Sequence, residues 1–152
     1  RDYKRNKPKS IGARFKKDST KMRIALIGHE TYENRGEIKE NVFKLKQRFG
    51  DELILVTRGK KQGIEKWVRK FALEMDIKYI EYNPASTSMS LYSGMEEDYY
   101  DKPYHPTQPL HQYDCIVHNS DKIVYFGDIK RNEFNHFKRL LNKWNKKASF
   151  VQ

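Results

Sequence analysis

The chain has 152 residues, of which 37% are hydrophobic and 13% aromatic, and its formal net charge is +11. This length suits a single domain, and the aromatic content excludes a wholly disordered chain. No run of about 18 apolar residues is present, so we expect no membrane-spanning segment and no membrane partner. A single cysteine, Cys115, excludes an internal disulfide and is typical of a reducing compartment, so we expect a cytoplasmic protein.

Residues 1–21 form a strongly basic segment with little apolar periodicity. They hold nine Lys and Arg against two Asp, whereas the remaining residues together carry only +4. We predict a basic flexible arm here, followed by one folded domain at residues 22–152. The arm has the charge to bind DNA or RNA phosphates, although a solvated tail without a specific partner fits the pattern equally well. Its candidate contacts are Arg5, Lys7, Lys9, Arg14, Lys16 and Lys17.

Short apolar runs alternate with amphipathic patterns along the folded part. The runs predict buried strands at 23–28, 52–57, 77–83, 120–128 and 148–151, and the patterns predict helices at 36–50, 64–75, 107–121 and 130–147. In the second helix, Ile64, Val68 and Phe71 recur at spacings that mark one buried face. Strand–helix alternation predicts right-handed crossovers and a mostly parallel sheet of about five strands. The expected fold is therefore α/β, a Rossmann-like three-layer domain.

A long connection at residues 83–106 interrupts this alternation. It is rich in Ser, Tyr, Pro and acidic residues, and a connection of this length in a small domain is usually functional or partly disordered. Four of its tyrosines suggest two roles: stacking on a base, or folding the loop onto the domain. These are Tyr92, Tyr99, Tyr100 and Tyr104.

Glycines mark the ends of three predicted strands. In open parallel sheets, ligands bind beyond the carboxyl ends of the strands, where "GHETYENR", "TRGKKQG" and "FGDIKRN" would lie. Gly59 and Gly63 precede a predicted helix, whose free N–H groups and dipole favour an anion, with Lys61 adding positive charge. A tight surface turn is the alternative. Neither the P-loop ending nor the three-glycine dinucleotide fingerprint is present.

Three stretches together resemble the SLOG superfamily of Rossmann-like nucleotide-binding domains, in its small bacterial and phage branch. They are "RIALIGHETYENRGEI", "LILVTRGKKQGIEKWVRKFALEMDIKYIEYNPA" and "SDKIVYFGD". The resemblance covers roughly residues 23–151 and implies a nucleotide or nucleotide-derived ligand. It departs from the family after the fourth strand, where "GDIKRNEF" replaces the usual Gly-Thr. The ligand-binding residues that the resemblance and the strand-end glycines imply are Gly28, His29, Arg58, Gly59, Lys61, Gly63, Glu65 and Gly127.

We therefore predict a nucleotide-binding domain without a bound cofactor. Two alternatives remain: a nucleic-acid-binding module that uses the basic arm, and an N-glycosidase acting on a nucleotide. Glu65 and Glu30 are the carboxylates that such cleavage would use. His105, His111 and His118 do not complete a metal-ligand pattern, so no metal is expected.

Overall fold

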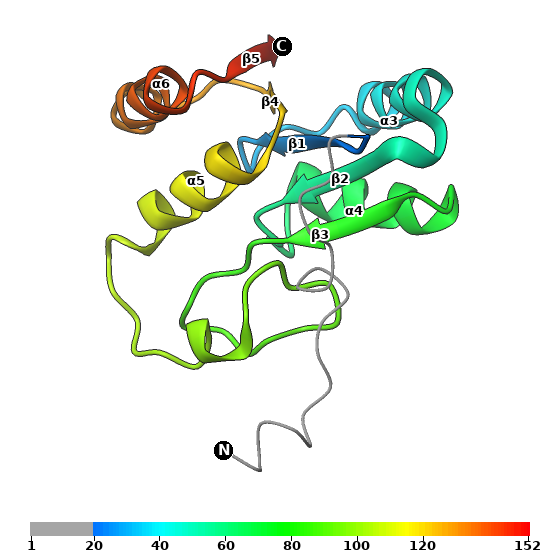
Figure 1. Ribbon diagram of the computed structural model, residues 1–152. Coiled ribbons are helices and arrows are strands. Elements are labelled where there is room, and N and C mark those ends of the chain that lie inside the picture. Colours follow the sequence, from blue (N-terminus) through cyan, green and yellow to red (C-terminus); the bar gives the residue numbers. More distant parts are fainter. Residues whose placement is uncertain (1–19) are drawn as a thin grey trace.

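The computed structural model describes residues 20–152, which form one parallel sheet covered by helices on both faces (Figure 1). The strands are β1 (Met22–Gly28), β2 (Leu53–Thr57), β3 (Lys78–Glu81), β4 (Lys122–Phe126) and β5 (Lys147–Val151). They lie in the order β3-β2-β1-β4-β5, and every neighbouring pair is parallel. The α/β prediction is confirmed, including the number of strands.

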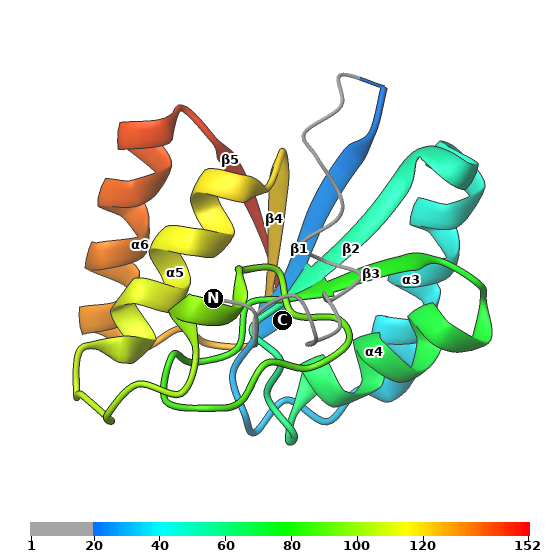
Figure 2. The same ribbon diagram turned by 60° about the horizontal axis from the view of Figure 1, so that its bottom comes forward.

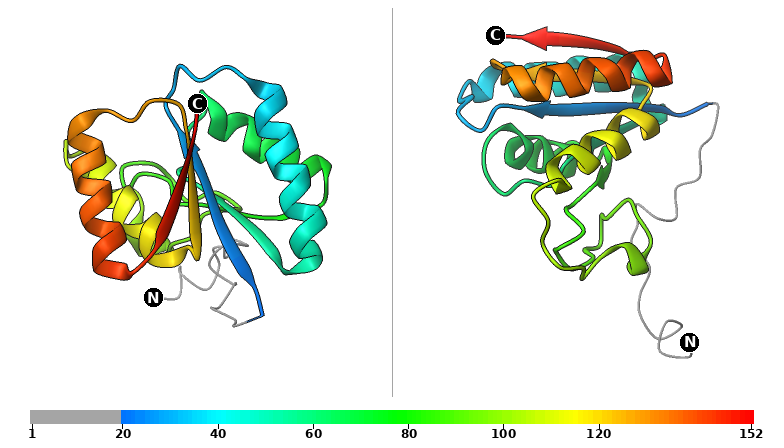
Figure 3. Two further views of the ribbon diagram at one scale, coloured as in Figure 1. Left: turned by 90° about the horizontal axis from the view of Figure 1, so that it is seen from above. Right: turned by 90° about the vertical axis from the view of Figure 1, so that its left-hand side faces the viewer.

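Two pairs of helices cover the two faces of the sheet (Figures 2 and 3). Helices α3 (Arg35–Phe49) and α4 (Ile64–Glu74) pack on one face. Helices α5 (Gln108–Asn119) and α6 (Arg131–Trp144) pack on the other. Two short 3-10 turns, η1 (Gly50–Glu52) and η2 (Glu97–Tyr99), lie in the connections.

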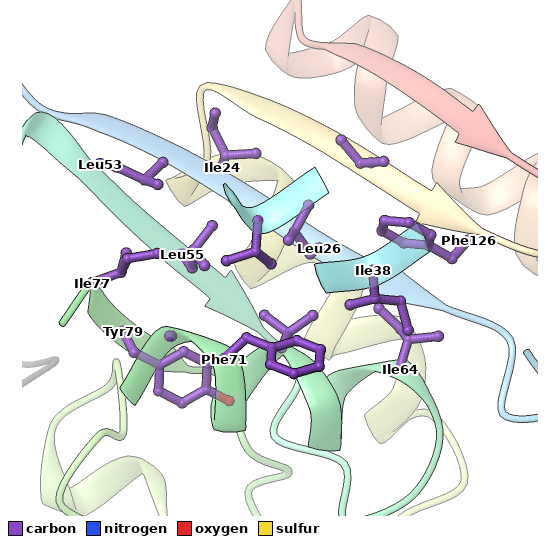
Figure 4. Packing of buried hydrophobic residues seen from close by; sticks show 14 residues of the cluster. Ile24, Leu26, Ile38, Leu53, Leu55, Ile64, Phe71, Ile77, Tyr79 and Phe126 are labelled. Atoms are coloured by element: carbon purple, nitrogen blue, oxygen red, sulfur yellow. The ribbon is translucent and has the colours of Figure 1, made fainter. Parts of the chain in front are cut away.

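The core consists of two apolar layers, one on each side of the sheet. Successive side chains of a strand point to opposite faces, so Ile24 and Leu26 of β1 enter the layer under α3 and α4. Figure 4 shows this layer, in which Ile38 of α3 lies near Ile64 of α4. Ala25 and Ile27 enter the layer under α5 and α6. Burial on both faces explains why the strands are continuous apolar runs.

The chain reverses its direction of progress across the sheet at β1. It first builds outward from β1 to β2 and β3, and then returns through α5 to place β4 on the other side of β1. Ligands of such folds bind where the strand order reverses, beyond the carboxyl ends of the two strands concerned. The carboxyl ends of β1 and β4 are therefore the expected ligand-binding region of this fold.

The connection after β3 folds against the edge of the sheet. Ser93 forms a parallel bridge with Glu81, and the amide of Gly94 donates to the Glu81 carbonyl at 2.7 Å. Tyr100 is buried and Tyr92 packs edge-on against Tyr79, whereas Tyr104 is 73% exposed. Part of the loop, including Tyr92 and Tyr100, therefore packs onto the domain.

None of the helices formed by residues 20–152 is both long enough and apolar enough to cross a membrane. The predicted arm lies outside the described residues except for its last two positions.

Candidate functional site

The ends of β1 and β4 meet closely at the carboxyl edge of the sheet. The His29 amide donates to the Phe126 carbonyl at 2.9 Å. A Cβ on Gly28 would lie 2.6 Å from the same carbonyl oxygen, so this approach requires glycine. Gly127 has a φ of 91° and lies against the His29 side chain. Three of the predicted site residues are therefore neighbours in space.

His29 is half-buried and has one ring nitrogen engaged. Its Nδ1 accepts from the Thr31 amide at 3.2 Å and lies 2.7 Å from the Thr31 hydroxyl. When Nδ1 accepts, the neutral ring carries its proton on Nε2. That Nε2–H is then a donor at the carboxyl edge with no partner among residues 20–152.

The loop between β2 and α4 leaves a row of backbone amides open. Gly63 is the N-cap of α4, with φ 76° and ψ −154°, and it offers no side chain to the first turn. The Gly59 amide donates to the Thr57 hydroxyl at 3.0 Å, but no acceptor within the described chain serves the amides of residues 60–65. The first amides of a helix carry partial positive charge. This loop is therefore suited to an anion.

Arg58 and Glu65 form an ion pair inside the protein. They are 4% and 1% exposed, and the Arg58 guanidinium contacts both carboxylate oxygens at 2.9–3.2 Å. The guanidinium also donates to the Gly28 carbonyl at 2.7 Å and to the Tyr113 hydroxyl at 3.2 Å. Burial opposes the charged guanidinium, but the Glu65 carboxylate outweighs it, so the pKa of Arg58 lies above its usual value.

This pair joins two of the predicted ligand residues to each other. The Nε and Nη2 atoms of Arg58 donate to Glu65 and Gly28, and Nη1 donates to Tyr113. Contact of a ligand with Nε or Nη2 would require the pair to open. The Arg58 amide also donates to Glu65 at 2.6 Å, which ties the end of β2 to the first turn of α4. We propose that both side chains have a positioning role and hold the open amides in place.

Lys60 and Lys61 supply exposed positive charge to the loop. Partial desolvation and the nearby Arg58 lower the pKa of Lys60, while Glu30 and Glu133 oppose that shift. The Lys60 ammonium therefore lies among groups from the ends of β1, β2 and β4. In the sequence, Lys60 directly follows Gly59, which indicated a positive charge beside the glycine loop.

A cavity of about 560 Å³ opens beside Gly63, between the starts of α3 and α4. Its lining combines a cation, two carboxylates and aromatic rings, a mixture suited to phosphate, hydroxyl and base. The lining residues are Glu30, Tyr32, Glu33, Arg35, Gly36, Gly63 and Trp67. The sequence analysis singled out neither Arg35 nor Trp67. The density of charged residues in "HETYENR" was the available signal.

The remaining predicted sites lie elsewhere or outside the described chain. Residues Arg5 to Lys17 fall among the undescribed positions, so their nucleic-acid contacts stay a prediction. His105 and His111 line a different cavity beside α5, and His118 stacks on Trp144. Within residues 20–152, no group of three or more His, Cys, Asp or Glu side chains is arranged to hold a metal ion.

Comparison with known proteins identifies the fold. No protein-family model matches the chain, and no curated protein sequence matches it. Among solved structures, DNA processing protein A from Helicobacter pylori, described by its single-stranded DNA binding mode, superposes with a TM-score of 0.64 at 15% identity. That alignment covers 96% of this chain and 79% of the other. The molybdenum cofactor carrier protein from Chlamydomonas reinhardtii gives a TM-score of 0.57 at 20% identity, covering 87% and 79%. At these identities the likeness shows a shared Rossmann-like fold.

Proposed function

We propose that this protein binds a nucleotide or nucleotide-derived ligand at the carboxyl edge of its sheet. The observation that supports the proposal is the row of amides at residues 60–65 without an acceptor among residues 20–152. Gly63 is the residue of this row that lines the cavity. Backbone amides that converge at a helix start are a common phosphate site.

Different groups around the amides would contact the phosphate and the ribose of the ligand. Lys60 and Lys61 balance the phosphate charge, and the backbone at Gly59 and Gly63 allows its close approach. The carboxylates of Glu30 and Glu33 line the cavity and suit the hydroxyls of a ribose.

A second part of the edge faces the sugar or base. His29 contributes its Nε2–H donor, and Gly28 and Gly127 allow the ends of β1 and β4 to approach each other closely beside it. The two solved structures of similar fold support this proposal only in general terms, because one is described as a cofactor carrier and the other as binding single-stranded DNA.

Calorimetric titration with matched ligands tests the proposal. The panel pairs nucleosides with their mono-, di- and triphosphates, and adds ADP-ribose and cyclic dinucleotides. We expect saturable binding that requires phosphate, and Lys61→Glu should weaken it about tenfold or more because two unit charges change near the anion. Lys122→Glu, the same change at the opposite end of β4, is the control and should bind normally. Absence of binding across the panel, or equal weakening by both variants, would overturn the proposal.

Of the two alternative functions, N-glycoside cleavage has one exposed candidate for the catalytic carboxylate. Glu30 lies in the cavity, whereas Glu65 is held in the buried ion pair. Release of free base from a nucleotide, abolished by Glu30→Gln without loss of nucleotide binding, is the result that this alternative requires. Binding of nucleic acid through the arm stays a separate prediction.

A further inference from the structure

The two edges of the sheet differ in how they are covered. At β3, the Glu81 amide donates to the Tyr92 carbonyl at 2.8 Å and the Gly94 amide donates to the Glu81 carbonyl at 2.7 Å, so the loop after β3 occupies that edge. At the other edge, β5 pairs with β4 alone, and no strand formed by residues 20–152 lies beyond it (Figures 1 and 3). Within the described chain, β5 is therefore the open edge of the sheet.

The pairing of β5 with β4 decides which backbone groups of β5 face outward. The Val151 carbonyl accepts from the Gly127 amide at 2.7 Å, so the backbone polar groups of Val151 face β4. The amide and carbonyl of one residue in a strand point to the same side, and those of the next residue point to the other side. Those of Ser149 therefore also face β4, whereas those of Ala148 and Phe150 point away from it. Among residues 20–152, these outward amides and carbonyls have no hydrogen-bond partner.

Phe150 gives this edge an exposed apolar side chain. Its ring centre lies 6.0 and 6.3 Å from those of Phe134 and Phe137 on α6, and yet the residue is 43% exposed. Ala148 lies two positions earlier on the same face of the sheet and has a small side chain. Lys147 is the one charged residue of β5, and it opposes strand pairing where it would meet another cation. The edge thus presents a large and a small apolar side chain next to each other.

We propose that β5 pairs with β5 of a second copy of this chain, antiparallel and centred on Ser149. In this register Ala148 of each copy lies opposite Phe150 of the other. Their outward amides and carbonyls then form four hydrogen bonds, two for each such pair. The small Ala148 side chain leaves room for the exposed part of the Phe150 ring. Lys147 lies opposite Val151, so the two lysines do not face each other.

The five residues of β5 supply both halves of this contact, which favours a second copy over an unrelated strand. Donors meet acceptors, the large side chain meets the small one, and the cation meets an apolar residue, all through one two-fold axis. A register centred on Ala148 or on Phe150 would leave one end of β5 unpaired. The contact is short, so we expect a weak, reversible dimer. The cavity beside Gly63 lies between α3 and α4 on the other face of the sheet, so this proposal does not depend on the nucleotide site.

Cysteine cross-linking tests the register. In a Cys115→Ser background, which removes the native thiol, a single cysteine is introduced as Ser149→Cys or Lys147→Cys. Opposite residues of a non-hydrogen-bonded antiparallel pair have Cα atoms about 4.5 Å apart, a distance that a disulfide spans. Ser149→Cys should therefore give a disulfide-linked dimer under mild oxidation. Lys147→Cys should not, because four residues separate the two positions along the strands, about 13 Å. Equal cross-linking of both variants, or of neither, would overturn the proposal.

Sedimentation velocity across a wide range of protein concentrations tests association of the full-length chain without a covalent link. We expect a monomer–dimer equilibrium that shifts toward the dimer as salt rises, because each copy carries a net charge of +11. Ala148→Pro removes the outward amide but no hydrogen bond to β4, so it should abolish the dimer and keep the melting temperature of the monomer. Ala148→Ser keeps the amide and should still dimerise. A wild-type protein that stays monomeric throughout, or a dimer that survives Ala148→Pro, would contradict the proposal.

Discussion

At the scale of single residues, the buried pair of Arg58 and Glu65 distinguishes this site from a simple glycine loop. Glu65→Gln would leave the guanidinium buried without its counter-charge, so we expect a loss of about 3–5 kcal/mol in the free energy of unfolding. Glu40→Gln breaks an exposed pair on α3 and should cost less than about 1 kcal/mol. Urea denaturation of both variants measures the difference.

The same comparison shows whether the positioning role is correct. A Glu65→Gln protein with wild-type stability would mean that the pair does not hold the edge together. Loss of nucleotide binding in this variant is informative only if it remains folded, which is why Glu30→Gln is the cleaner variant for testing cleavage.

Sequence reasoning located the position of Arg58 but not the direction of its side chain. Arg58 stands among exposed lysines, which favoured a charge that faces a ligand. A signal for the opposite was present in α4: Glu65, Val68 and Ala72 have spacings of three and four, so they lie on one buried face. A carboxylate on a buried face needs a cation, and Arg58 at the end of β2 supplies it.

At the scale of elements, a hydrogen-bond network attaches the long loop to β3. Glu81 is 2% exposed, and its carboxylate accepts from the Tyr79 hydroxyl and Asn83 at 3.0 Å and from Ser90 at 3.3 Å. The Tyr79 hydroxyl in turn contacts Thr57 at 2.7 Å, which bonds the Gly59 amide. The loop and the phosphate-binding segment therefore share one network.

Removal of the Glu81 carboxylate should release the loop before the domain unfolds. In Glu81→Ala, we expect faster proteolysis and faster amide exchange within residues 83–106, while the core strands keep their protection. Limited proteolysis with mass spectrometry locates the cuts. Glu74→Ala on the exposed end of α4 is the control, and equal cleavage of the two variants would show that Glu81 does not hold the loop.

Most helices and strands could be predicted from the sequence, because buried parallel strands and amphipathic helices have distinct patterns of apolar residues. Strand ends shifted by a few residues: the third strand stops at Glu81, before the expected Asn83, where the chain turns into the long connection. The network around Glu81 was not readable, since it joins residues 57, 79, 81 and 90, which only the folded topology brings together.

At the scale of the whole molecule, buried tyrosines make stability sensitive to alkaline pH. Burial raises the pKa of Tyr82 to about 12, from an unfolded value near 10. Below pH about 10 the hydroxyl is protonated in both states, so its contribution to stability is fully present. Between pH about 10 and about 12, the unfolded chain loses the proton first, and stability falls by roughly 2 kcal/mol from this residue alone.

Urea midpoints measured across this alkaline range check the expectation. Burial also raises the pKa of Tyr125 to about 12, so the loss should exceed that from one group. Tyr82→Phe should flatten part of the pH dependence, whereas replacement of the exposed Tyr104 should not. A free energy of unfolding that stays constant up to pH about 12 would contradict the burial of these hydroxyls.

The central claim is that the amides between Gly59 and α4 hold the phosphate of a nucleotide. Nitrogen–proton correlation spectra of the labelled protein, recorded during titration with the tightest ligand of the panel, observe those amides one by one. We expect saturable shifts that are largest at residues 60–65 and absent with the matching nucleoside. Saturable binding that leaves these amides unshifted, while others move, would contradict the claim.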